Sequence, residues 1–114
     1  MGSEDRAEYN DGRDWENIEF TSSSSDAVED ITFNILSSDA ETSTTKNLNK
    51  GSLGTGFVLR PSTTVTIVQI NENVLRNPIT VTTAGLSISK HMIDLTKLII
   101  RTTATSTIIR LLIT

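Results

Sequence analysis

The chain of 114 residues contains no cysteine, few aromatic residues and no long apolar run. Without cysteine it has no disulfide, no thiol nucleophile and no thiolate metal ligand. Aromatic residues make up 4% of the chain, so Ile, Leu and Val must build the core around a few large anchors, Trp15, Phe20, Phe33 and Phe57. No apolar window of about 18 residues occurs, which argues against a membrane-spanning helix. The polar, acidic start, residues 1–6, is unlike a secretory signal, so we expect no secretion by that route.

Serine and threonine are abundant, with 18 Thr and 13 Ser. Thr favours strands and Ser favours turns. Short apolar or alternating stretches recur with turn signals every eight to twelve residues, which predicts a single β-sandwich, jelly-roll-like, of about eight short antiparallel strands. The expected strands lie near residues 17–20, 31–36, 57–60, 65–70, 79–82, 86–89, 98–102 and 107–113, with a weak edge strand near 42–45.

The closing stretch, residues 97–114, has the strongest strand pattern. It contains two β-branched arms, LIIRT at 98–102 and TIIRL at 107–111, joined by a polar linker. The nearly continuous apolar positions indicate strands covered on both faces. We interpret the arms as neighbouring strands, which would place Arg101 and Arg110 side by side. Two like charges there would need carboxylates, from Glu16, Glu19 or a second subunit.

Charge is divided unevenly along the chain, whose net charge is −4. Residues 1–30 hold ten acidic groups and two arginines, whereas residues 31–114 hold four acidic groups and eight Lys or Arg. We therefore expect a disordered acidic N-terminal arm at 1–14, followed by a sandwich domain at 15–114. The acidic segment either lies on a complementary basic surface or remains a solvated tail.

The residues that could perform chemistry form no known catalytic or metal-binding pattern. His91 is the only histidine, and Asp94 alone is close to it in sequence, which leaves any metal ion short of ligands. The glycines of 51–56 precede a strand rather than a helix, so they suit a turn better than a phosphate site. Scattered basic residues and a pI of about 4.8 argue against nucleic-acid binding. We expect no enzyme activity, no metal and no cofactor.

Ile18 and Phe20 share one face of a short strand that is flanked by acidic residues, whereas Trp15 falls out of phase with them, so we expect its indole to pack separately. The strand either packs on its own domain or adds to the sheet edge of a neighbour, which would satisfy backbone groups and bury the three side chains. Together with Arg101 and Arg110, these three residues are the predicted partner-binding residues.

Two stretches, GTGFVLRPSTTVTI at 54–67 and KLIIRTTATSTIIRLLIT at 97–114, resemble the small all-β structural proteins of tailed viruses, such as head decoration proteins and short fibre or adaptor modules. The resemblance implies a cysteine-free, Thr-rich β module that assembles symmetrically and whose N-terminal arm reaches a neighbour or the shell. No coiled coil, repeat or glycan-cleaving carboxylate pair accompanies it, so a tailspike enzyme is not supported.

These observations lead to one expectation and two alternatives. We expect a non-enzymatic virion structural protein, assembled in the host cytoplasm, that binds a capsid or tail protein and forms a homo-oligomer, with a trimer favoured. The first alternative is a carbohydrate- or receptor-binding sandwich that uses the polar loop at 37–51. The second is a small hydrolase that uses His91. Neither a membrane nor a nucleic-acid partner is expected.

Overall fold

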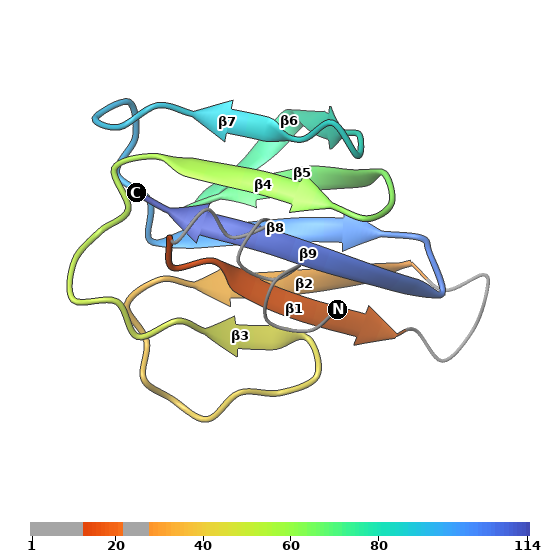
Figure 1. The fold of residues 1–114 in the computed structure, drawn as a ribbon, viewed down its shortest axis with the longest axis horizontal. Helices are drawn as coiled ribbons and strands as arrows, with labels where there is room; N and C mark the ends of the chain where they lie inside the picture. The colour runs from red at the N-terminus through yellow and green to blue at the C-terminus, as the bar shows by residue number, and fades with distance from the viewer. Residues whose placement is uncertain (1–12, 22–27) are drawn as a thin grey trace.

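The computed structural model describes residues 13–21 and 28–114, and in this part of the chain every regular element is a β-strand. Figure 1 shows the nine strands in order. Their bounds are Glu16–Thr21 (β1), Glu29–Asn34 (β2), Thr45–Asn47 (β3), Phe57–Pro61 (β4), Val65–Ile70 (β5), Asn73–Val81 (β6), Leu86–Ile88 (β7), Lys97–Thr102 (β8) and Ser106–Ile113 (β9). The expected all-β class is confirmed.

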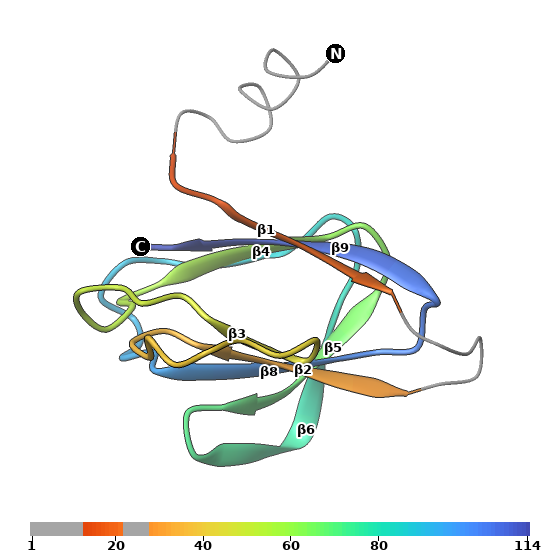
Figure 2. The same cartoon turned by 90° about the horizontal axis from the view of Figure 1, so that it is seen from below.

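The strands form two sheets, which lie one over the other as two layers (Figure 2). The first sheet has the order β1-β9-β4-β7, and the second has the order β3-β2-β8-β5-β6. All paired strands are antiparallel except β2 and β3, which run parallel. β3 corresponds to the weak edge strand expected near 42–45, but it begins three residues later, at Thr45. Its parallel pairing with β2 places it at the edge of the second sheet.

The strand pairs are nested along the chain. β5 pairs with β6, β4 with β7, β2 with β8, and β1 with β9, all antiparallel. The chain therefore behaves like one long hairpin whose tip is the β5–β6 turn, wound so that successive pairs fall in alternate sheets. β3 lies outside this scheme, as an addition to the edge beside β2.

Alternate residues of the strands face the space between the sheets and form one core. On β9, Ile109 and Leu111 are fully buried, whereas Ile108 is 43% exposed. Phe33, Phe57 and Phe20 belong to the same core, as expected for the few aromatic anchors. The fourth anchor, Trp15, does not belong to the core cluster, although it is buried.

The prediction that the two closing strands are neighbours is wrong. β8 lies between β2 and β5 in the second sheet, and β9 lies between β1 and β4 in the first. The linker between them, residues 103–105, crosses from one sheet to the other, so Arg101 and Arg110 occupy different sheets. β8 and β9 have similar sequences because each is a central strand of its own sheet, and a central strand needs an apolar face toward the core.

Two further boundaries differ from expectation. The strand expected at 57–60 extends by one residue to Pro61, which pairs with Ile109 of β9. A proline suits a strand end because it has no N–H to donate. β6 begins at Asn73, earlier than expected, and a bulge between Ile67 and Gln69 of β5 shifts its register.

Asn71, at the β5–β6 turn, holds the segment that leads into β8. Its backbone has a positive φ of 55°, which asparagine tolerates better than most residues. Its Oδ1 accepts hydrogen bonds from the N–H of Thr96 at 2.7 Å and of Lys97 at 3.2 Å. Its Nδ2 donates to the carbonyl of Asp94 at 2.6 Å. One side chain thus satisfies several backbone groups where β8 begins.

Candidate functional site: the arginine–tryptophan cluster

Trp15 lies on the outer face of the first sheet, immediately before β1. Only 6% of the residue is exposed, although it contributes nothing to the core between the sheets. Leu112 of β9 is buried in the same way, also outside the core cluster, and on β9 it alternates with the inward residues Ile109 and Leu111. The prediction that the indole packs apart from Ile18 and Phe20 is therefore confirmed.

Three guanidinium groups surround the Trp15 ring. The Cζ atoms of Arg110, Arg60 and Arg13 lie 4.6, 5.1 and 5.6 Å from the ring centroid. These distances fall in the range in which a cation is attracted to the negative face of an indole. We call Arg13, Trp15, Arg60 and Arg110 the arginine–tryptophan cluster.

The strands fix two members of the cluster opposite one another. Arg60 of β4 and Arg110 of β9 are register partners in neighbouring antiparallel strands. Like charges placed directly across a strand pair repel each other. The indole offsets part of this repulsion, since both guanidiniums contact its ring. The outer face of the first sheet therefore concentrates positive charge at one place.

The indole N–H of Trp15 is buried, and it has no hydrogen-bond acceptor among the described residues. Buried donors are normally paired, because an unpaired one loses its hydrogen bond to water without replacement. The cluster thus combines cationic groups with a donor that lacks an acceptor, an arrangement suited to an anionic ligand.

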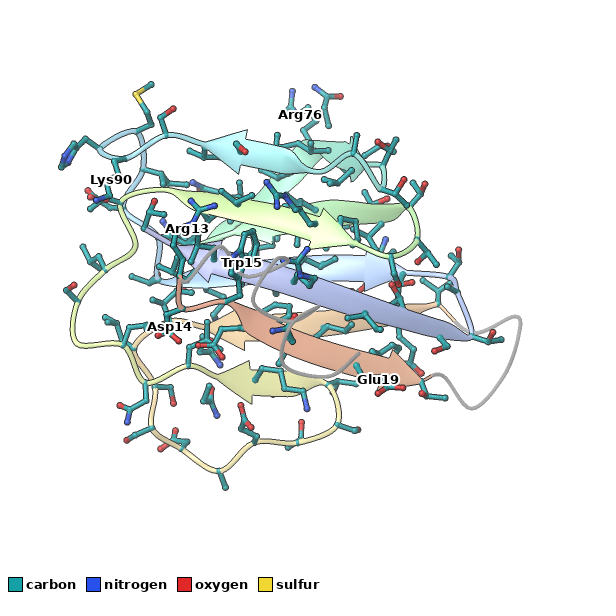
Figure 3. The ribbon with its side chains drawn as sticks, viewed as in Figure 1. Arg13, Asp14, Trp15, Glu19, Arg76 and Lys90 are labelled. Atoms are coloured by element: carbon teal, nitrogen blue, oxygen red, sulfur yellow. The ribbon has the colours of Figure 1, made fainter. Side chains whose placement is uncertain are left out.

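The surroundings of the cluster carry charges of both signs, as Figure 3 shows. Arg13, Asp14 and Lys90 line a shallow depression together with Leu112, Ile113 and Thr114. The carboxylate of Asp14 accepts a hydrogen bond from Lys50 Nζ at 3.1 Å, and Glu16 Oε1 lies 3.0 Å from the same nitrogen. Burial lowers the pKa of Lys50, but the hydrogen bonds and charges of Glu16 and Asp14 raise it by more, so the net shift is upward.

The other predicted partner-binding residues lie elsewhere. Phe20 is in the core, and Ile18 is partly buried against it, because β1 pairs with β9 of the same chain. Arg101 forms a two-point ion pair with Asp30, its register partner on β2, at 2.7 and 3.0 Å. The hydrogen bonds and charge of Asp30 raise the pKa of Arg101. Of the partners expected for Arg101, which were Glu16, Glu19 or a second subunit, neither Glu16 nor Glu19 is the one observed, because Asp30 takes that place.

Sequence reasoning identified Trp15 and Arg110 but missed Arg60 and Arg13. Arg60 alternates with the buried Leu59 and Pro61, which indicates an outward position. Nothing in the sequence, however, shows that β4 lies beside β9. That pairing, formed between segments almost fifty residues apart, brings Arg60 to Trp15.

His91 is an exposed turn residue with a positive φ of 70°. The backbone carbonyl of the nearby Asp94 accepts the hydrogen bond from Asn71. Across residues 13–21 and 28–114, no three His, Asp or Glu side chains gather as metal ligands would. The same residues include no helix with the length and apolarity to span a bilayer. The arginine–tryptophan cluster is accordingly the candidate site, and its chemistry is suited to binding.

A scan of protein-family models, a search of curated proteins and a search of solved structures each find no match to this chain.

Proposed function

We propose that this chain is a non-enzymatic structural protein of a virus particle, which binds a capsid or tail surface and assembles as a homo-oligomer. We also propose that the two-layered fold is a jelly roll and that residues 1–14 act as its acidic arm, although residues 1–12 lie outside the described part. The nested strand order is the single observation that carries the proposal.

The strand order supports a jelly roll directly. With β3 set aside, the sheets have the orders β1-β9-β4-β7 and β2-β8-β5-β6. A jelly roll is an eight-stranded double sheet in which a long antiparallel hairpin wraps into two Greek keys. Capsid proteins and lectins are recurrent users of this architecture. The argument to function is one from fold class, joined to a site suited to binding.

An exposed apolar edge supports self-association. β6 is an edge strand of the second sheet, and on it Val74 is 76% and Ile79 is 36% exposed. Exposed apolar groups on an unpaired edge invite pairing with another chain, and proteins usually cover or charge such edges. A contact between copies of this chain would cover β6.

Fractionation tests the proposal. Particles from the source of the chain are separated on a density gradient and probed with an antibody against the chain, and the purified chain is examined by sedimentation velocity. We expect the chain in the particle fraction and an oligomer in solution. A strict monomer found only in the soluble fraction would contradict the proposal.

The alternative, a carbohydrate- or receptor-binding module, shares the proposed fold class and has its own supporting observation. The polar segment at 37–51 is held by Asn47, whose N–H donates to Glu41 at 2.8 Å and whose Nδ2 donates to the Asp39 carbonyl at 3.0 Å. An ordered polar loop is suited to binding hydroxyl groups. Trp15 is too buried to serve as a sugar-stacking surface. Binding to a glycan array, lost in Asn47→Ala, would favour this alternative over the first.

A further inference from the structure

We propose that the arginine–tryptophan cluster is the docking site for a carboxylate-rich segment of the capsid or tail protein. The inference rests on the proposed function and gives it a contact surface with a stated chemistry. It also gives a role to the two arginines that face each other across β4 and β9.

Arg60 carries the argument. Its guanidinium contacts the Trp15 ring, and among the described residues it forms no ion pair. Arg13 and Arg110 have additional interactions within the chain, so they position the ring and add to the local positive potential. A planar guanidinium binds a carboxylate through two parallel hydrogen bonds, which suits an Asp or Glu side chain.

Trp15 contributes a second, independent feature. Its indole N–H is buried without an acceptor in the described part of the chain. A carboxylate oxygen would supply that acceptor, and its desolvation beside three guanidiniums would be compensated by charge-assisted hydrogen bonds. A cation could not accept a hydrogen bond from the indole N–H, and the three guanidiniums would repel it.

The charges around the cluster favour a short acidic protein segment over nucleic acid. Asp14 lies to one side of Trp15, and Glu19 is exposed farther along β1 (Figure 3). Glu16 shares Lys50 with Asp14. A continuous phosphate backbone would run past these carboxylates, and the net charge of −4 would add to the repulsion. A protein loop with two or three acidic side chains can contact the arginines alone.

The single tryptophan allows a direct test. The full chain is titrated at low ionic strength with a hexaglutamate peptide while Trp15 fluorescence is recorded. We expect a saturable change in fluorescence, with an affinity that falls as salt is added. Salt screens the attraction between exposed charges, and the screening length is about 8 Å at physiological ionic strength. Hexaglutamine should produce no change.

Two variants locate the binding. Arg60→Glu should weaken hexaglutamate binding about tenfold or more, because it replaces an exposed attraction with a repulsion. Arg76→Glu, an equal charge reversal at an exposed position on β6 of the other sheet, should leave the affinity unchanged. Both variants should keep the far-ultraviolet circular dichroism spectrum and the cooperative unfolding of the parent chain, which would show that the fold is intact.

Other results would overturn the inference. No saturable change with hexaglutamate, or equal weakening by the two variants, would show that the cluster is no carboxylate site. Tighter binding of oligothymidylate than of hexaglutamate would assign the cluster to nucleic acid. If hexaglutamate binds as expected but the chain is missing from particles, the site stands and the proposed function fails; the reverse result removes the site and leaves the function.

Discussion

Asn71 shows how much of this fold depends on one polar side chain. It accepts from the backbone N–H groups of Thr96 and Lys97, donates to the Asp94 carbonyl, and adopts a left-handed backbone. A sequence motif of Asn-Glu-Asn indicates a turn, which is where the residue lies. The partners, more than twenty residues away, are set by the pairing of β5 with β8 and cannot be seen in the motif.

Replacing Asn71 tests this role. Asn71→Ala should lower the free energy of unfolding by about 1–3 kcal/mol, because it removes hydrogen bonds and strains the backbone. Asn71→Gly is the control for backbone strain, since glycine accepts the positive φ and loses only the hydrogen bonds. Urea denaturation measures both. Equal stability of Asn71→Ala and the parent chain would show that the contacts contribute nothing.

The bridge from Lys50 to Asp14 and Glu16 predicts a dependence on alkaline pH. The folded pKa of Lys50 lies above its ordinary value of 10.5, so the bridge stabilises the fold fully below that value and loses its effect as pH rises through the folded pKa. Relative to Lys50→Gln, the parent should be more stable by a few tenths to about 1 kcal/mol at neutral pH. Denaturation at several pH values should show this difference shrinking above pH 10.5. A difference that grows with pH would contradict the assignment.

Individual strands were predictable, because their signals are local. Alternation in β2, and the β-branched runs of β5, β8 and β9, place strands at nearly the positions observed. Ends were less predictable. β4 extends to include Pro61, which pairs with Ile109, and β6 begins at Asn73, because Asn73 and Val74 pair with Ile70 and Gln69 of β5. Pairing with a neighbouring strand thus extends an element beyond its own sequence pattern.

The register of β9 gives a test at this scale. Ile109 is fully buried and Ile108 is 43% exposed, although they are adjacent and identical in type. Ile109→Ala should cost about 2–5 kcal/mol of unfolding free energy, and Ile108→Ala under about 1 kcal/mol. If the register of β9 were shifted by one residue, the costs of Ile109→Ala and Ile108→Ala would be exchanged, because neighbouring side chains of a strand point to opposite faces.

Gly56 tests the close approach of the segment before β4 to the end of β7. A Cβ at position 56 would lie 2.5 Å from the backbone oxygen of Ile88, whereas one at position 51 would meet nothing within 4 Å. Gly56→Ala should therefore destabilise the fold by at least about 2 kcal/mol, since backbone must move. Gly51→Ala is the matched control and should be nearly neutral. Thermal unfolding distinguishes them, and similar midpoints would contradict the close approach.

At the scale of the molecule, the sequence predicts the fold class but not the topology. Two similar closing strands suggest neighbours, yet β8 and β9 belong to opposite sheets. Apart from the β5–β6 hairpin and the short β2–β3 pair, the paired strands lie far apart in sequence, so local patterns carry no record of their pairing. The candidate site likewise has members that the sequence indicates and members that only the strand pairing reveals. Trp15 and Arg110 were recognisable by type, whereas Arg60 joins them only through the pairing of β4 with β9.

Electron microscopy of the particle fraction tests the central claim most directly, that this chain works by attachment to a virus particle and to copies of itself. We expect regularly placed modules of 12.4 kDa on the capsid or tail, with the outer face of the first sheet against the particle. Particles without such density, together with a chain that remains monomeric in solution, would contradict it.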